Sequence, residues 1–166
     1  MLLSAEASVL LLVDLQPRFA PADGVISNAG RLAEAAALMD VPVRATVRGP
    51  VEPPLVRSPP PLARTVFNAV AAEGFAGLLP NGADEVVVTG ACAHIGVLQT
   101  VLGLLAARHR VLVVADALDA RPAQRAVALD RMQRHGAELV TTEMVMFEWL
   151  RDAAHPCHAE VQRLLG

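Results

Sequence analysis

A short segment in the middle of the chain places a possible nucleophile and a possible base between a strand pattern and a helix pattern. In VVVTGACAHIGVLQT (residues 86–100), β-branched residues end at Thr89-Gly90, and Cys92 and His94 precede an apolar helical run. A cysteine just beyond a buried strand can attack a substrate when a histidine takes its proton. A lone cysteine is more often a small buried apolar residue, and His94 could equally point outward or cap the helix. Both interpretations stay open.

Asp14 and Arg64 also occupy positions that suit chemistry. Asp14 closes the almost wholly apolar run VLLLVDLQ. Partial desolvation there favours general acid or base catalysis, and a turn-capping aspartate is the alternative. Arg64 follows a proline-rich segment and could hold a substrate anion through two hydrogen bonds, although a surface arginine is the commoner case.

Strand and helix patterns alternate along the whole chain and would position these residues. The predicted strands are 9–14, 41–47, 84–90, 110–116 and 137–142. The predicted helices are 27–39 (capped by Ser27 or Asn28), 69–78, 95–108, 122–136 (closed by Gly136) and two tail helices broken at His155-Pro156. The prolines in residues 48–63 exclude regular structure there, and that loop could form either a wall of the site or an ordinary surface loop.

This alternation predicts an α/β fold in one domain over residues 1–166. The expected architecture is a three-layer sandwich, in which helices cover both faces of a central parallel sheet of five or six strands. Ligands bind such sheets at the carboxyl ends of the strands. That edge would collect Asp14, Arg48, the turn at 89–94 and Asp116.

Composition excludes several classes of function. Hydrophobic residues make up 54% of the 166 residues, but no apolar run is long enough to cross a bilayer, so we expect no membrane partner. The net charge of −3 provides no basic surface for nucleic acid. Two distant cysteines without a secretory signal indicate free thiols and a cytoplasmic protein. All 14 basic residues are arginine, which excludes any mechanism that needs lysine.

No cofactor or metal site is expected from the sequence. The segment HPCH (residues 155–158) groups three potential ligands, but Pro156 breaks the chain there, and three donors on one turn seldom converge on one ion. Neither a phosphate-binding loop nor a dinucleotide-binding fingerprint is present. We therefore expect a small-molecule substrate to be handled by side chains and by the backbone amides of the turn at 89–94, which could polarise it.

Separate segments, in the same order along the chain, resemble the isochorismatase-like hydrolase superfamily. LLLVDLQPRF resembles the family's first strand, PLARTVFNA the segment with its catalytic lysine, and VVVTGACAHIGVLQTVLGLLAARHRVLVVADALDAR the active-site strand, turn and helix. RAVALDRMQRHGAELVTTEMVMFEWLRDAAHP is similar to the C-terminal part. The resemblance covers nearly the whole chain and implies a parallel sheet between two helical layers.

The resemblance also implies a catalytic set of aspartate, lysine and cysteine. Asp14 matches the aspartate, Arg64 the lysine and Gly96 the cysteine, while Cys92 lies one helical turn earlier. Isochorismatases of siderophore and phenazine pathways have a similar turn, GVYAHIGC, with glycine at the same place. Their aspartate protonates an enol-ether carbon, and no covalent intermediate forms. Arg64 could supply the positive charge of the family lysine but cannot shuttle a proton.

We expect four further residues at this edge to contact the substrate: Ala91, His94, Phe19 and Arg48. Three functions are compatible with the set. The first, which we favour, is a hydrolase for a vinyl ether or an amide that uses Asp14 without a covalent thiol. The second is an amidase in which Cys92 attacks. The third is a catalytically silent protein that binds a small molecule or a partner.

A homo-oligomer, a dimer or higher, is also expected. The helical segments VLQTVLGLLAA and EMVMFEWL are apolar over more than one stripe, which a single small sheet need not cover. The alternative is that both helices are central in the monomer.

Overall fold

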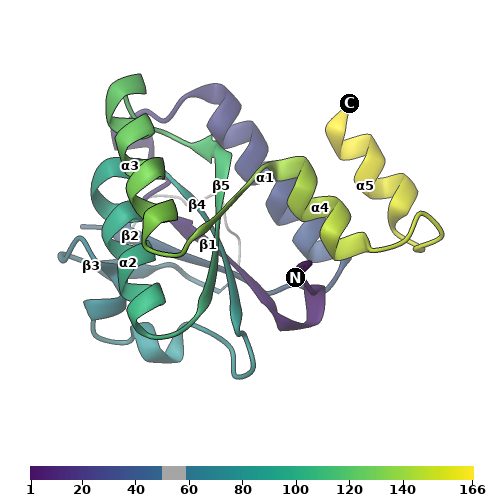
Figure 1. Ribbon diagram of the computed structural model, residues 1–166, viewed down its shortest axis with the longest axis horizontal. Coiled ribbons are helices and arrows are strands. Elements are labelled where there is room, and N and C mark those ends of the chain that lie inside the picture. The colour runs from purple at the N-terminus through teal and green to yellow at the C-terminus, as the bar shows by residue number, and fades with distance from the viewer. Residues whose placement is uncertain (50–58) are drawn as a thin grey trace.

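The computed structural model describes residues 1–49 and 59–166 and contains one parallel sheet between two layers of helices (Figure 1). The strand order is β3-β2-β1-β4-β5-β6, and every pair of neighbours is parallel. The strands are β1 (Ser8–Val13), β2 (Val43–Arg48), β3 (Leu62–Arg64), β4 (Glu85–Gly90), β5 (Arg110–Leu118) and β6 (Glu138–Val140). The predicted α/β three-layer sandwich is confirmed.

Alternate residues of β1 build the cores on the two faces of the sheet. Leu10 and Leu12 pack with α1 (Asp23–Leu38), α4 (Thr142–Leu150) and α5 (His158–Leu165). The odd-numbered residues of β1 pack instead with α2 and α3, which span Leu98–Ala106 and Pro122–Arg134. Because β1 lies between β2 and β4, all six of its residues are buried.

Helix α1 begins earlier than predicted. Its N-cap is Ala22, and Ser27 and Asn28 lie inside the helix, so the predicted cap is wrong. The Ala22 amide donates instead to the Asp119 carboxylate, at 3.3 Å. Asn28 donates from its side chain to the carbonyl of Asp116, at 2.8 Å, and therefore ties α1 to β5.

Residues 62–64 form β3 at the edge of the sheet, although the proline-rich segment was expected to lack regular structure through residue 63. The strand begins just after the last proline, and an edge strand pairs on one side only, so this local composition is tolerated. The predicted wall of the site falls largely on residues 50–58, outside the described part of the chain.

Two further helix predictions differ from the structure. The segment 69–78 contains two short 3-10 turns, η3 (Ala69–Ala71) and η4 (Phe75–Gly77), separated by Gly74 at a positive φ. The predicted helix 95–108 begins as a π-helical turn, η5 (Ala93–Val97), and continues as α2. By contrast, α3 ends before Gly136, whose φ of 106° is the left-handed conformation predicted for the end of this helix. The tail helices α4 and α5 are separate, as expected.

No helix in the described parts of the chain is both long enough and apolar enough to span a membrane.

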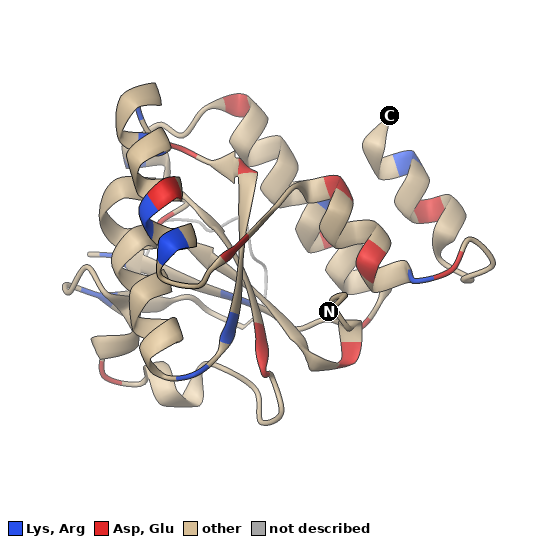
Figure 2. Cartoon of the chain, viewed as in Figure 1, with Lys and Arg blue, Asp and Glu red and all other residues tan. Residues whose placement is uncertain are grey.

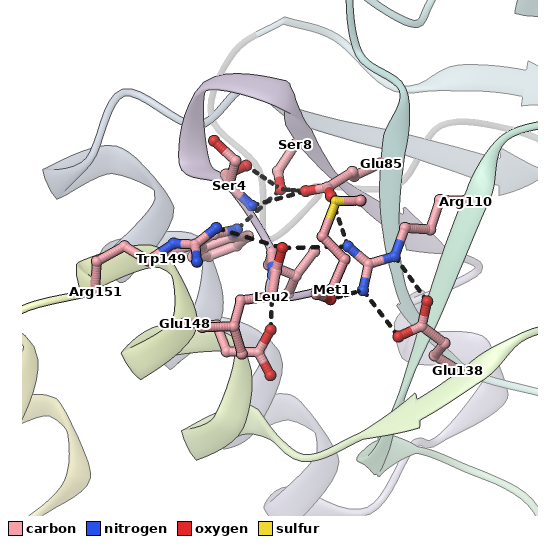
Figure 3. Close-up of polar contacts among 11 residues, drawn as sticks. Met1, Leu2, Ser4, Ser8, Glu85, Arg110, Glu138, Glu148, Trp149 and Arg151 are labelled. Carbon is pink, nitrogen blue, oxygen red and sulfur yellow. Dashed lines mark hydrogen bonds and ion pairs between the residues drawn. The ribbon is translucent and has the colours of Figure 1, made fainter.

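The amino ends of the strands are joined to the N-terminal segment by a dense set of polar contacts (Figure 3). Glu85 is buried, forms an ion pair with Arg110 at 2.6 Å, and accepts hydrogen bonds from the Ser4 amide at 2.8 Å and the Ser8 hydroxyl at 3.3 Å. The Trp149 indole of α4 donates to the same hydroxyl at 3.0 Å. This cluster fixes the end of the sheet opposite to the carboxyl ends of the strands.

We expect Glu85→Gln to lower the free energy of unfolding by about 2 kcal/mol, because it removes a buried charge and replaces by an NH2 group one of the two oxygens that accept from three donors. Glu138→Gln is the matched control: Glu138 binds the same arginine, but its side chain is 49% exposed, so a loss below about 1 kcal/mol is expected. Urea unfolding of both variants measures the difference. Equal losses would contradict a special role for Glu85.

Candidate active site

Four neighbouring strands bring the chemically competent residues to one edge of the sheet. Asp14 follows β1, Arg48 and Arg64 end β2 and β3, and Gly96 lies in η5 just after β4. Since β3, β2, β1 and β4 are consecutive in the parallel sheet, their carboxyl ends are adjacent. Residues that are up to 82 positions apart, from Asp14 to Gly96, therefore meet at one site.

Asp14 is a carboxylate with no exposed surface, held between two guanidinium groups. Its Oδ1 accepts a hydrogen bond from Arg64 Nη2 at 2.8 Å, and its Oδ2 accepts one from Arg48 Nε at 2.9 Å. Its φ is 55°, a left-handed conformation that aspartate tolerates better than most residues. Its backbone is fixed by the Thr46 carbonyl and by the Gln16 amide. Both carboxylate oxygens of Asp14 are thus engaged in ion pairs, and neither of them caps the turn that follows β1.

Arg64 is a buried partner of Asp14. Its side chain has no exposed surface, and Nη1 donates to the Val66 carbonyl at 2.6 Å while Nη2 binds Asp14. Burial lowers the pKa of the Arg64 guanidinium from its ordinary value, and the charge of Asp14 opposes that change. A hollow of about 390 Å³ between Gly49 and Glu73 borders Arg64. These bonds orient Asp14, while the buried Arg64 Nε has no hydrogen-bond partner among the described residues.

Arg48 is the arginine at the surface of the site. Its side chain is 15% exposed and covers Asp14, and its Cζ lies 4.4 Å from the ring centroid of Phe19 and 5.3 Å from that of Phe67. The structure thus brings together the predicted contacts Phe19 and Arg48 beside Asp14.

Gln16 positions Arg48, a role that the sequence analysis did not assign. Its side-chain Oε1 accepts from the Arg48 amide at 2.8 Å, and its Nε2 donates to the Arg48 carbonyl at 3.2 Å. Gln16 is only 2% exposed, so these bonds replace water for both of its polar groups. A polar residue two positions after Asp14, at the end of a buried strand, is the sequence feature that could have indicated it.

Gly96 leaves the space that the Asp14 carboxylate fills. A Cβ at position 96 would lie 2.5 Å from Asp14 Oδ2 and 3.6 Å from Arg64 Nη2. The first distance is far below van der Waals contact, and Oδ2 cannot swing away freely because Arg48 binds it. The present position of Asp14 and any side chain at residue 96 therefore exclude each other.

Cys92 lies near these groups but not in an activating environment. It is half-buried and precedes η5 with a φ of 54°. Burial raises the pKa of the Cys92 thiol above its ordinary value, Asp14 adds to that rise, and Arg48 opposes it. A raised pKa keeps the thiol protonated at neutral pH, whereas nucleophilic attack needs the thiolate.

His94 lines a hollow on the side of α3. This hollow, of about 410 Å³, also borders Ala123, Val127 and Arg131 and contains none of Asp14, Arg48 and Arg64. The His94 Nδ1 is buried without a hydrogen-bond partner among the described residues. Whether His94 serves Cys92 as a base stays a prediction.

The remaining candidates at this edge are backbone amides and Asp116. The Ala91 amide donates to the Val13 carbonyl at 3.0 Å, and the Ala93 amide donates to the Asp119 carbonyl at 2.9 Å. The Cys92 amide between them has no acceptor in residues 1–49 and 59–166, so it is a candidate donor to a ligand. Asp116 caps α4 instead, accepting from the amide of Thr142 at 2.8 Å, and is not part of the site.

Comparison with known proteins shows which family this chain belongs to. Residues 8–144 match the Isochorismatase domain family. The chain belongs to the isochorismatase family. Mouse isochorismatase domain-containing protein 2A is 34% identical over an alignment of 176 positions, gaps included, that covers 96% of this chain and 83% of the mouse protein.

Solved structures are similar to this chain over its whole fold. The MAR1 ribonuclease of Caenorhabditis elegans matches with a TM-score of 0.90 and 28% identity, covering 99% of this chain and 92% of that protein. The Escherichia coli YcaC gene product, described as an octameric hydrolase of unknown specificity, matches with a TM-score of 0.82 and 25% identity, covering 99% of this chain and 89% of that one. Membership of the isochorismatase family supports a hydrolase-like function for this protein.

Proposed function

We propose that this isochorismatase-family protein hydrolyses a small molecule of the vinyl ether or amide type through Asp14, without a covalent thiol intermediate. The observation that carries the proposal is the close fit of Asp14 Oδ2 against Gly96, at the position where the family resemblance places the cysteine nucleophile. The acid–base group of the site is retained and buried, while the attacking group must come from water.

Asp14 is the proton carrier in this proposal, and the arginines hold it in place. On a vinyl ether, Asp14 first takes up a proton from water and passes it to the enol carbon. Water captures the resulting oxocarbenium ion and releases a proton, and the hemiacetal separates into a carbonyl compound and an alcohol. On an amide, Asp14 accepts a proton from the attacking water and returns it to the leaving nitrogen. The free Cys92 amide is the candidate to polarise a substrate oxygen.

A silent binding protein is the second candidate, and the burial of the site favours it. Neither Asp14 nor the Arg64 side chain has exposed surface, so Arg48 must move before a substrate atom can reach the carboxylate. An amidase that uses Cys92 has less support, because burial raises the pKa of its thiol and no hydrogen bond joins it to His94 within the described residues.

Turnover of a small panel by the wild type and two variants tests these alternatives. The panel comprises isochorismate, nicotinamide, simple amides and a short RNA, and the variants are Asp14→Asn and Cys92→Ala. We expect one small molecule to be consumed, with Cys92→Ala within about threefold of the wild type, because no covalent bond to the thiol is needed. Loss of turnover after thiol alkylation would favour Cys92. Binding of a panel member without any turnover would favour the silent protein.

RNA belongs in the panel because a structural neighbour is named a ribonuclease. Acidic and basic residues are interspersed over the helices (Figure 2), and the net charge is −3. Phosphate backbones are held by concentrated basic surface, so we expect no RNA cleavage.

We also propose a homo-oligomer. The octameric YcaC neighbour supports it, as do the partly exposed apolar side chains of Met144 and Phe147 on α4 and of Val127 on α3. Light scattering should give a mass that is a multiple of the 17.5 kDa chain, and a stable 17.5 kDa species at micromolar concentration would contradict the proposal.

A further inference from the structure

Two arginines at the rim of the site face the same aromatic ring. The Cζ of Arg18 lies 4.8 Å and that of Arg48 lies 4.4 Å from the ring centroid of Phe19. A Cβ at Gly49 would lie 3.0 Å from Arg18 Nη1, so the guanidinium of Arg18 rests against the backbone that directly follows Arg48. Two like charges are thus gathered within a few ångströms of Phe19.

Positive charge exceeds negative charge in this cluster. Arg48 and Arg64 share the single carboxylate of Asp14, and Arg18 forms no ion pair within residues 1–49 and 59–166. Among the side chains joined by these ion pairs and by Phe19, three guanidinium groups therefore accompany one carboxylate, while Glu73 lines the hollow beside Arg64 and Asp119 lies within electrostatic range of Cys92. Like charges held close together repel unless an anion joins them, and a partly buried setting increases the attraction for that anion.

The terminal nitrogens of Arg48 favour recognition of a carboxylate. Arg48 binds Asp14 through Nε and also lies beside the Cys92 thiol, but its two terminal nitrogens have no oxygen acceptor in the described residues. Two parallel guanidinium N–H groups match the two oxygens of a carboxylate. Phe19 and Phe67 line the same guanidinium, and Phe67 is 47% exposed, so an apolar planar group could stack beside the bound anion.

We propose that Arg18 and Arg48 bind the carboxylate of a substrate whose body is planar and apolar. This inference rests on the proposed function, since it names the substrate class of the same site. A carboxylate at the terminal nitrogens of Arg48 leaves the bond from Nε to Asp14 in place, so one guanidinium would hold the substrate anion and the acid–base group at the same time.

Benzoate, its neutral isostere benzamide and inorganic phosphate are suitable probes of the intact protein. Titration of ¹⁵N-labelled protein by NMR yields each dissociation constant, and the amides of residues 18, 19, 48 and 49 should shift with benzoate. We expect benzoate to bind at least about tenfold more tightly than benzamide, because only benzoate neutralises the excess charge. Phosphate should bind more weakly than benzoate, since it has no planar group to lie beside Phe67.

Variants separate the two arginines from general charge effects. Arg48→Gln should weaken benzoate binding about tenfold, and Arg18→Gln, at an exposed residue that the fold does not need, about threefold. Arg134→Gln, on the exposed surface of α3, removes the same charge and should leave binding unchanged. The inference is overturned if benzamide binds as well as benzoate, if phosphate binds more tightly, or if neither Arg18→Gln nor Arg48→Gln differs from Arg134→Gln.

The titration requires no turnover and so separates this inference from the proposed function. Benzoate binding that depends on both arginines, in a protein that consumes no substrate, would refute the hydrolase and retain the anion site. Turnover of a neutral substrate with no preference for benzoate would do the reverse.

Discussion

Asp14→Asn is expected to reduce kcat/KM by about 1000-fold on whichever substrate the panel identifies, because an amide cannot exchange the proton that the carboxylate carries. The effect should fall mainly on kcat, since the carboxylate is buried and contributes to the chemical step more than to binding. Steady-state kinetics of the purified variant measures it. Wild-type turnover by Asp14→Asn would remove Asp14 from the mechanism.

The same substitution should also cost stability. It leaves the fully buried Arg64 guanidinium without its counter-charge, and breaking a buried ion pair typically costs about 3–5 kcal/mol. Kinetics must therefore be measured where circular dichroism shows a folded variant. Asp116→Asn is a fitting control, because that carboxylate also follows the buried run of a strand but caps α4, away from the site. It should keep turnover and lose about 1 kcal/mol of stability.

Gly96→Cys is expected to abolish turnover and not to restore a thiol enzyme. The new Cβ would lie 2.5 Å from Asp14 Oδ2, so the carboxylate must leave its bond to Arg48. Overpacking of this kind costs about 1–3 kcal/mol of unfolding free energy. Urea unfolding and thiol titration would measure the stability and the reactivity of the introduced cysteine.

Two companion variants identify the cause. Gly96→Ala should lose nearly as much stability as Gly96→Cys, because the clash belongs to the Cβ and not to the sulfur. Adding Arg48→Gln to Gly96→Cys frees Oδ2 to move, so the combined loss should be smaller than the sum of the two single losses. Additive losses, or a Gly96→Cys protein as stable as the wild type, would show that Asp14 adjusts without cost.

The central strands could be predicted from the sequence because buried parallel strands are continuous apolar runs. β1, β4 and β5 each appear as such a run, and the rule that ligands gather at their carboxyl ends places Asp14 and Arg48 at one edge. β3 could not be predicted in this way, since it is a three-residue edge strand that begins directly after prolines. The start of α1 was missed because Ala22 carries no side-chain cap.

The roles of individual arginines could not be predicted, because burial of a single arginine leaves no trace in the local sequence. The local sequence did not indicate that Arg64 is buried and bonded to Asp14 and to the Val66 carbonyl, and its contact with a substrate anion stays a prediction. Arg18 received no role, since its approach to Phe19 and Gly49 depends on how the chain turns after β1. His94 was grouped with Cys92 by sequence proximity alone, and the turn directs it toward α3.

Because η5 is π-helical, the number of residues in this turn affects the site as directly as the types of its residues do. The hydrogen bonds of a π turn enclose one residue more than those of an α turn. The extra residue in η5 therefore sets the direction in which each side chain between β4 and α2 points around the helix axis. With this turn, Gly96 faces Asp14 and His94 faces the opposite side. A one-residue deletion here would rotate the following positions by about 100° and carry the glycine away from the carboxylate, with every side chain of the site unchanged. Insertions and deletions in this turn should therefore be as rare among functional relatives as substitutions of Asp14 itself.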